Sequence, residues 1–151
     1  MTNSKNSPDT TELLQELFDT GSVTRFIKRN HDHMQKPPFY SYLKSECNKR
    51  NIIPAQVIAK SGIERTFGHH IFKGDKNPSR DKVIQLAFGF EMNYEETQAL
   101  LKAANKSPLY PKIMRDAVVI YVLNQNAPLS EAQIALEELS LPIIGKEGRY
   151  E

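Results

Sequence analysis

The sequence has a single cysteine, no long apolar run and no apolar leader, and each of these shortages excludes a class of protein. Because Cys47 is the only cysteine, a disulfide framework within the chain is excluded and a reducing compartment is expected. No apolar stretch approaches the roughly 18 residues that a membrane-spanning helix needs. Residues 1–8 are polar and lack the apolar core of a secretory signal. These absences predict a soluble, cytoplasmic protein.

The net positive charge of the chain is small, but the excess of basic residues is concentrated in one segment. The net charge is only +2 over 151 residues. Residues 1–42 balance five Lys or Arg against five Asp or Glu, residues 43–82 carry nine against four, and residues 83–151 carry six against nine. The basic excess in the middle segment is typical of a protein that binds a polyanion, although a solvated lysine-rich surface would give the same count.

Apolar residues recur at helical spacing in most of the chain, and no segment alternates for long with the period of a strand, so the predicted fold class is all-α. Asp9 and Glu12 have the spacing of a capping box and start a helix that Gly21 ends. A second short helix follows, which we expect to fade in the polar stretch 30–33. The prolines in Lys36-Pro37-Pro38 disfavour helix at the residue before each of them and mark a linker.

From Phe39 onward the pattern is helical almost to the end of the chain. The expected helices cover residues 39–47, 54–60 and 64–72, a segment capped by Ser79 that reaches residue 88, a segment around 100–104, residues 111–123, and a segment capped by Ser130 that reaches residue 139. The predicted organisation is therefore a leader with one or two short helices at 1–38, a helical domain at 39–108, and a C-terminal helical hairpin packed on it at 109–151.

Residues 80–104 and 115–139 look like two copies of one helical hairpin. Arg80-Asp81 recurs as Arg115-Asp116, 35 residues later, and Gln98 recurs at the same offset as Gln133. The predicted arrangement stacks the second hairpin on the first, so that both bury their apolar faces. Chance similarity is an alternative, because helices draw on few residue types.

The most informative segment is 56–80, which has a short helix, a glycine turn and a second short helix. A helix-turn-helix motif joins two helices by a turn of three or four residues that commonly contains glycine. Gly62 can adopt the left-handed conformation that such a turn requires. We expect Ile63 at the junction of the two helices and Ile71 on the core side, which leaves the face that carries Arg65 pointing outward.

Residues 40–101 resemble the Cro/XRE-type, or lambda-repressor-like, helix-turn-helix family of phage repressors and bacterial regulators. The resemblance is carried by Gly62-Ile63, Ile71, Lys73-Gly74 and Asn77-Pro78-Ser79, in the family's spacing and without a gap. The run through Leu109-Tyr110-Pro111 and Arg115-Asp116 is similar to a bacterial subgroup with an extra C-terminal helical hairpin. The resemblance implies a compact five-helix bundle at 39–108 whose usual function is operator binding as a dimer.

The resemblance also implies which residues contact DNA. The recognition helix, about 64–72, would enter the major groove with its N-terminal residues at the base edges. The residues implied to contact bases are Arg65, Thr66, His69 and His70, with His69 nearest the backbone, and those implied to contact phosphates are Gln56, Lys60, Lys73, Lys76 and Arg80. An arginine at position 65 suits the O6 and N7 atoms of guanine, and the threonine beside it suits a thymine methyl group.

Two positions differ from the usual residues of that family. Ile58 stands where the family usually has alanine, and Gly68 stands where the recognition helix usually has a buried aliphatic residue. Glycine destabilises the interior of a helix by about 1 kcal/mol relative to alanine. We therefore expect a close backbone approach at Gly68, with Phe67 filling the space.

The remaining candidate sites predict no chemistry. His69 and His70 point in different directions from a helix, and His31-Asp32-His33 matches a loop, so no metal site is predicted. Cys47 lies on an apolar stripe without an indicated base partner, which favours a small buried hydrophobe over a nucleophile. The common catalytic and nucleotide-binding motifs are absent from the sequence. We therefore predict that the protein is not an enzyme and has no cofactor.

The function predicted from the sequence is a cytoplasmic, sequence-specific, double-stranded DNA-binding regulator of transcription that acts as a homodimer. The C-terminal hairpin is expected to extend the core and to offer a surface for dimerisation or for a protein partner. The alternative is a protein–protein interaction adaptor that uses the same bundle without binding DNA, which the small net charge favours. A continuous positive face around the motif would favour DNA, and an exposed apolar patch would favour a protein partner.

Overall fold

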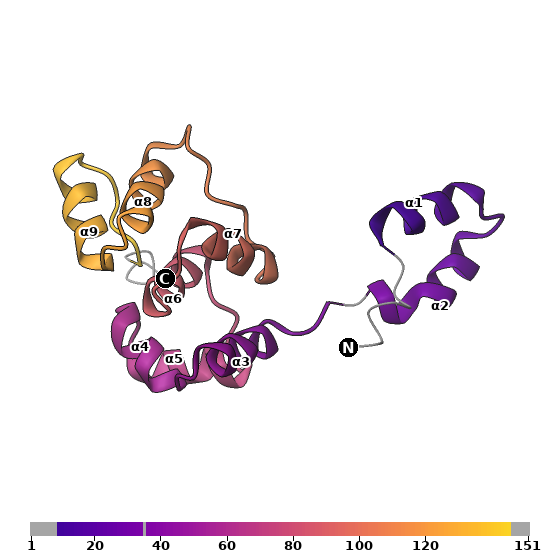
Figure 1. Ribbon diagram of the computed structural model, residues 1–151, viewed down its shortest axis with the longest axis horizontal. Helices are drawn as coiled ribbons and strands as arrows, with labels where there is room; N and C mark the ends of the chain where they lie inside the picture. The colour runs from indigo at the N-terminus through magenta and orange to yellow at the C-terminus, as the bar shows by residue number, and fades with distance from the viewer. Residues whose placement is uncertain (1–8, 35, 146–151) are drawn as a thin grey trace. The chain divides into compact units, whose positions relative to one another are not determined.

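The computed structural model describes residues 9–34 and 36–145, and every regular element in those ranges is a helix. The prediction of an all-α fold is therefore confirmed. The chain divides between Pro37 and Pro38 into two units, which we call unit 1 and unit 2 (Figure 1). Among the helices of the described ranges, none has both the length and the apolar character needed to cross a membrane.

Unit 1 is a pair of helices, α1 (Thr10–Asp19) and α2 (Val23–Met34). Asp9 caps α1, because its side chain accepts a hydrogen bond from the backbone N–H of Glu12 at 2.8 Å. The two helices pack against each other as a hairpin. The start expected from the capping-box spacing is therefore confirmed.

The sequence predicts that the second helix of unit 1 fades at residues 30–33. This prediction is wrong, because α2 continues to Met34. Asn30 shows why, since this side chain is buried within the hairpin. Its amide nitrogen donates to the backbone carbonyl of Phe26 and to the carboxylate of Glu16, each at 3.1 Å. A polar residue remains in a helix when its side chain finds such partners.

Unit 2 contains the other helices of the described chain. In chain order they are α3 (Phe39–Arg50), α4 (Pro54–Ser61), α5 (Arg65–Lys73), α6 (Arg80–Gly89), α7 (Tyr94–Ala103), α8 (Met114–Asn124) and α9 (Leu129–Glu138) (Figure 1). Left-handed residues end α4 at Gly62 and α5 at Gly74. The hydroxyl group of Ser79 caps α6 by accepting from the backbone N–H of Lys82. These expected helix boundaries are confirmed.

Two expected helix starts in the C-terminal part are wrong. α8 begins at Met114 and not near residue 111, because residues 110–113 form a hydrogen-bonded turn. α9 begins at Leu129 with Pro128 at its N-cap, so Ser130 lies inside the first turn and does not cap the helix. Proline suits a helix start because the first N–H groups of a helix have no partner within it.

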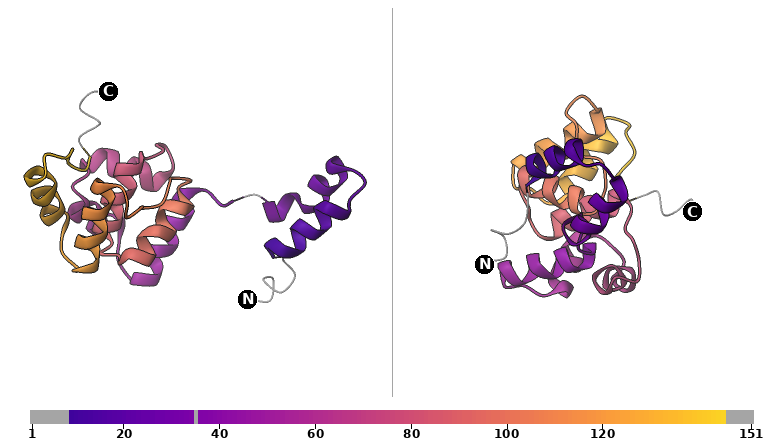
Figure 2. Two further views of the ribbon diagram at one scale, coloured as in Figure 1. Left: turned by 90° about the horizontal axis from the view of Figure 1, so that it is seen from above. Right: turned by 90° about the vertical axis from the view of Figure 1, so that its right-hand side faces the viewer.

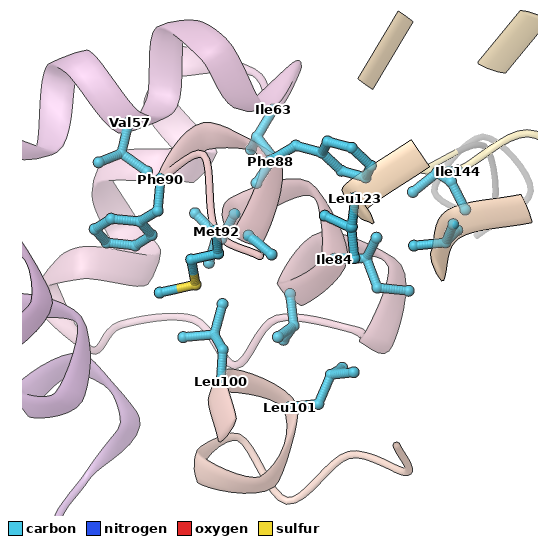
Figure 3. Close-up of a cluster of buried hydrophobic side chains, with 14 of the residues drawn as sticks. Val57, Ile63, Ile84, Phe88, Phe90, Met92, Leu100, Leu101, Leu123 and Ile144 are labelled. Atoms are coloured by element: carbon cyan, nitrogen blue, oxygen red, sulfur yellow. The ribbon is translucent and has the colours of Figure 1, made fainter. Parts of the chain in front are cut away.

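α6 lies at the centre of the hydrophobic core of unit 2. Its residues from Val83 to Gly89 are all buried, and it packs against α4 and α7. Figure 3 shows Ile84 and Phe88 of α6 in one cluster with side chains from other helices. The labelled side chains from those helices are Val57 of α4, Leu100 and Leu101 of α7, and Leu123 of α8. One core therefore extends from α4 to the C-terminal helices.

The hairpin α6–α7 is repeated by the hairpin α8–α9. The bounds of α7 and α9 correspond at an offset of 35 residues, and α8 begins one residue earlier than the same offset from α6 would give. Residues Glu91 and Asn126, which are equivalent in the connections, have positive φ angles of 58° and 56°. The second hairpin packs its helices against each other as the first does (Figure 2). The repeat seen in the sequence is therefore a structural repeat.

Two arginine–aspartate pairs join the hairpins to each other. Arg80 donates to both carboxylate oxygens of Asp116, at 3.1 and 2.9 Å. Arg115 donates to both carboxylate oxygens of Asp81, at 2.9 and 2.6 Å. Both aspartates are buried, and each is paired with the arginine of the other hairpin in the bidentate geometry that makes such pairs strong.

Each hairpin also holds the segment that follows it in the same way. Gln98 exchanges two hydrogen bonds with the backbone N–H and carbonyl of Leu109, and Gln133 does the same with Ile144. The arginines donate to further carbonyl groups, those of Ser107 and Pro108 for Arg80 and those of Pro142 and Ile143 for Arg115. The equivalence of these bonds shows that the two hairpins share one plan of stabilisation.

Candidate nucleic-acid interface

The turn between α4 and α5 is fixed by hydrogen bonds of small polar side chains. Gly62 has a φ angle of 75°, in the left-handed region expected for it. The hydroxyl group of Ser61 donates to the carbonyl of Ile58 and accepts from the backbone N–H of Ile63. The side chain of Glu64 caps α5 by accepting from two backbone N–H groups. These contacts set the angle at which α5 leaves α4.

One face of α5 is buried against the rest of unit 2. Ile71 is 1% exposed, and Ile63 at the start of the turn is 7% exposed, so both lie on the core side as expected. Gly68 is also buried, and a Cβ atom placed on it would come within 2.8–3.0 Å of three side-chain atoms of Ile58. Ile58, and not Phe67 as expected, therefore fills the space at Gly68.

The unusual residues at positions 58 and 68 are thus complementary. A larger residue on α4 faces a missing side chain on α5, so the contact between the two helices keeps its volume. Val57 and Ile58 are both buried, and α4 packs against α5 as well as α6. The close backbone approach expected at Gly68 is confirmed, and it seats α5 against α4.

The opposite face of α5 is polar and faces solvent. It carries Arg65, Thr66, His69, His70 and Lys73, whose spacing places them on one side of a helix. Arg65, Thr66 and Lys73 are exposed, and the two histidines are partly exposed. Two of these five residues are permanently cationic and two are able to become so, and none is acidic. We call these five residues the α5 polar face.

Two acidic residues lie at the ends of the α5 polar face. The Nδ1 atom of His70 is 3.1 Å from a carboxylate oxygen of Asp75, and the side chains of both are largely open to solvent. The pKa of Glu64 lies below its usual value, because its carboxylate accepts hydrogen bonds from the backbone N–H of Thr66 and then from that of Phe67. Glu64 is therefore ionised and committed to the cap of α5.

Of the residues predicted to contact phosphates, four lie exposed on or beside the two helices, and one of them, Lys73, also belongs to the α5 polar face. They are Gln56, Lys60, Lys73 and Lys76. The side-chain oxygen of Gln56 accepts from the backbone N–H of Ile53, which leaves the amide nitrogen for an outside acceptor. Lys60 forms an exposed ion pair with Glu91 at 3.4 Å, which is the kind of pair that contributes little to stability and exchanges readily.

Arg80 differs from these four residues because it is held within the fold. Its guanidinium donates to Asp116 and to the carbonyl groups of Ser107 and Pro108. Its charge is paired with a buried carboxylate. These contacts give Arg80 a structural role and make it a weaker candidate for a phosphate contact than the exposed lysines.

The sequence interpretation missed two residues beside α5. The Nζ atom of Lys82 lies 5.2 Å from the centre of the Phe67 ring, which places a further cation next to α5. Tyr40 packs against Gly74, where a Cβ atom would lie within 2.6 Å of the tyrosine ring. Lys82 is three residues after the Ser79 cap, and that spacing could have indicated its place in the first turn of α6.

The remaining candidates of the sequence hold no site in the described chain. Within residues 9–34 and 36–145, no group of three or more His, Cys, Asp or Glu side chains could hold a metal ion. Cys47 is buried, as expected, and burial raises the pKa of its thiol, so the thiol stays protonated. His31 and Asp32 lie within α2 and not in a loop.

Comparison with known proteins adds no relative. No protein-family model, no curated protein and no solved structure matches this chain.

Proposed function

We propose that the protein is a sequence-specific, double-stranded DNA-binding regulator of transcription of the Cro/XRE type. In this proposal α3 to α7 form the lambda-repressor-like bundle and α5 is the recognition helix. The observation that carries it is the α5 polar face, which is cationic and open to solvent directly after a left-handed Gly62 turn. The opposite face of the same helix is buried, which is the arrangement that a helix needs to enter a groove.

The chemistry of the α5 polar face supports direct reading of bases. Arg65 lies in the first turn of α5 and can donate two hydrogen bonds to the O6 and N7 atoms of guanine. Thr66 beside it can contact a thymine methyl group, and His70 can donate or accept at a base edge. The hydrogen bond that Nδ1 of His70 donates to the carboxylate of Asp75 fixes the orientation of the His70 ring.

The residues around α5 support binding to the DNA backbone. Lys60, Lys73 and Lys76 are exposed, and Lys82 lies beside Phe67 of α5. Such contacts fix the register of a protein on DNA and make its affinity fall with salt. Glu64 and Asp75 oppose phosphates nearby, so one copy alone is expected to bind modestly. A homodimer that reads two half-sites about 34 Å apart compensates for this.

The experiment that tests the proposal combines selection with salt titration. Duplexes selected from a random pool by the full chain are sequenced, and the binding of the selected duplex is followed by fluorescence anisotropy. Arg65→Ala is expected to relax the preference at a single base pair of each half-site, with a loss of about 1–3 kcal/mol on the selected duplex. Lys73→Ala is expected to weaken binding to all duplexes alike and to lower the salt slope by about one.

A matched control separates this effect from a general loss of charge. Lys112 is exposed and lies between α7 and α8, so Lys112→Ala removes one positive charge away from α4 and α5. This variant is expected to bind as the wild type does. A folded dimer that shows no salt-dependent binding to any duplex contradicts the proposal.

A second candidate function is a protein-interaction adaptor. The observation that favours it is that three apolar side chains of the C-terminal hairpin, Tyr121, Ile134 and Leu139, are 66%, 53% and 60% exposed. Exposed apolar surface is a feature of sites where proteins bind. The two functions separate in one assay, because Tyr121→Ser with Ile134→Ser leaves DNA binding intact if α5 is the functional helix.

A further inference from the structure

The α1–α2 hairpin has an apolar face that its own two helices do not cover. Of its apolar side chains, only Phe26 is buried within the described part of unit 1. The exposed ones are Leu14, Leu17, Phe18, Val23, Ile27 and Met34, with Phe18 at 71% exposure. On α1, Leu17 and Phe18 lie three and four positions after Leu14, and on α2 these residues are four and seven positions apart, which places them on one side of each helix.

A hairpin of this size is too small to be stable through its own core. α1 has 10 residues and α2 has 12, lengths at which an isolated helix is marginal in water. Chains below about 40 residues usually need a disulfide, a metal or an association with another chain. Unit 1 has no cysteine, and its described residues hold no group of metal ligands. Association with another surface is the remaining source of stability.

The charges of the hairpin identify a matching surface. In and just before α1 the charged residues are Asp9, Glu12, Glu16 and Asp19, and none is basic. In α2 they are Arg25, Lys28, Arg29 and one acid, Asp32, besides two histidines. The opposite charges of α1 and α2 already form one ion pair within the hairpin, in which Arg29 lies 3.4 Å from the carboxylate of Glu16. The same complementarity is available when α1 of one hairpin lies beside α2 of another.

From this combination of an uncovered apolar face and opposite helix charges, we infer that the α1–α2 hairpin is a dimerisation module that pairs with the same hairpin of a second copy. Two hairpins then form a four-helix bundle in which each acidic α1 meets the basic α2 of the other copy. Pairing of α1 with α1 would instead bring acid against acid. The exposed apolar residues form the core of that bundle.

The use of this dimer rests on the proposed function. Each copy brings one unit 2, joined to its hairpin through Pro37 and Pro38, so the module supplies two α5 helices to one DNA duplex. The module itself does not need DNA to form. Its test is therefore done without DNA, which keeps a failure of the dimer distinct from a failure of DNA binding.

The first experiment measures the mass of the full chain by sedimentation equilibrium. The wild type is expected to be a dimer, and Phe18→Asp combined with Ile27→Asp is expected to raise the dimer dissociation constant by more than about tenfold, because buried charges without partners oppose association. The matched control is Tyr121→Asp with Ile134→Asp, which places the same charges on exposed apolar positions of unit 2. This control is expected to leave the dimer intact.

The second experiment tests the charge pairing with residues outside the ion pair between Arg29 and Glu16. A chain with Glu12→Lys and Asp19→Lys is expected to be monomeric, as is a chain with Arg25→Glu and Lys28→Glu. A mixture of the two is expected to form a heterodimer, since each supplies the charge that the other lacks. Helix content by circular dichroism shows whether each variant is folded.

Three results overturn the inference. They are a wild-type chain that stays monomeric, a dimer that only the Tyr121 and Ile134 variant disrupts, and a mixture of charge-reversed chains that does not associate. A monomer that still binds DNA with a salt dependence overturns the inference and leaves the proposed function standing. A hairpin-dependent dimer that binds no DNA does the reverse.

Discussion

The hairpins α6–α7 and α8–α9 have the same plan but different surroundings. Each contributes an arginine and an aspartate to the crossed pairs, and each uses one glutamine to hold the segment behind it. α6 is buried along its length, whereas α8 exposes Tyr121 and Asn124. The same arrangement of bonds therefore stabilises a hairpin at the centre of the core, α6–α7, and a hairpin in its outer layer, α8–α9.

One pair of equivalent positions explains this difference. Gly89 ends α6, and a Cβ atom there would meet the backbone carbonyl oxygen and the side chain of Val57 in α4. The equivalent residue of α8 is Asn124, which is exposed and has a full side chain. α4 can lie close to the first copy because Gly89 has no side chain, and α5 is seated on α4. The helices proposed to bind DNA, α4 and α5, therefore pack on the first hairpin, where Gly89 leaves room for α4.

The largest effect is expected from breaking the crossed ion pairs. Asp116→Ala leaves the guanidinium of Arg80 without its carboxylate in a largely buried place, and should lower the free energy of unfolding by about 3–5 kcal/mol. Asp81→Ala should cost about as much, because Arg115 is in the equivalent position. Urea denaturation of both variants measures this. A loss of stability in only one of the two variants would show that the two ion pairs do not stabilise the fold equally.

A smaller effect is expected at the position where the copies differ. Gly89→Ala places a methyl group against Val57 and should cost about 1–3 kcal/mol, since the backbone of α4 must shift. Asn124→Ala should change the stability by no more than about 0.5 kcal/mol, because that position is exposed and alanine favours a helix. Urea denaturation of the two variants compares them directly. Equal costs would refute the role assigned to Gly89.

Gln98 and Gln133 should contribute equally to the free energy of unfolding. The effect of replacing either should be somewhat smaller than that of Gly89→Ala. Gln98→Ala leaves the backbone N–H and carbonyl of Leu109 without partners, and Gln133→Ala does the same to Ile144. Leu109 and Ile144 are both buried, so each variant should lose about 1–2 kcal/mol. Hydrogen exchange of the Leu109 and Ile144 amides should rise only in the corresponding variant. A rise at both amides in either variant would mean that the segments open together.

The smallest effect concerns the helix caps of the second helix in each copy. In α7 the carboxylate of Glu96 accepts from the backbone N–H of Asn93, which lowers the pKa of Glu96, and Arg50 lowers it further. In α9 the equivalent N-cap is Pro128, which has no N–H to donate. A lowered folded-state pKa stabilises the fold above the unfolded-state value and loses that contribution as the pH falls through the folded-state value.

The comparison between Glu96 and its equivalent Glu131 tests this. Glu96→Gln should lose about 0.5 kcal/mol at pH 7 and little at a pH below its folded-state pKa, a small figure because the side chain is partly exposed. Glu131→Gln should lose less than Glu96→Gln at pH 7, because Pro128 has no N–H that the carboxylate of Glu131 could accept. Urea midpoints of the wild type and both variants, measured at the two pH values, test this expectation. An equal pH dependence of Glu96→Gln and Glu131→Gln would contradict the role assigned to the Glu96 cap.

Much of the local structure could be predicted because its causes lie close together in the chain. Gly62, Gly74 and Ser79 end or start helices through contacts with neighbouring residues. The outward face of α5 follows from helical spacing alone, since Ile71 indicates the buried side. The start of α9 was wrong because Pro128 and Ser130 are both suited to a helix start, and the sequence pattern does not choose between them.

The features that could not be predicted depend on contacts between distant residues. Arg80 was assigned to DNA because it is basic and near the motif, but its partner Asp116 is 36 residues away. The repeated Arg-Asp doublet contained that information, although only the folded chain shows that the pairs cross. Ile58 and Gly68 likewise stood out as separate departures, and their contact explains both at once.

The crossed arginine–aspartate pairs make the C-terminal segment a condition for the rest of unit 2. A chain shortened after Pro108 would lose Asp116 as the partner of Arg80, and Arg115 and Gly145 as donors to Asp81. Both losses fall in the first turn of α6, the helix against which α4 packs. A chain that ends at residue 108, the domain boundary predicted from the sequence, should therefore be insoluble or unfolded. A chain that begins at Pro38 and keeps the C-terminal segment retains every one of these bonds.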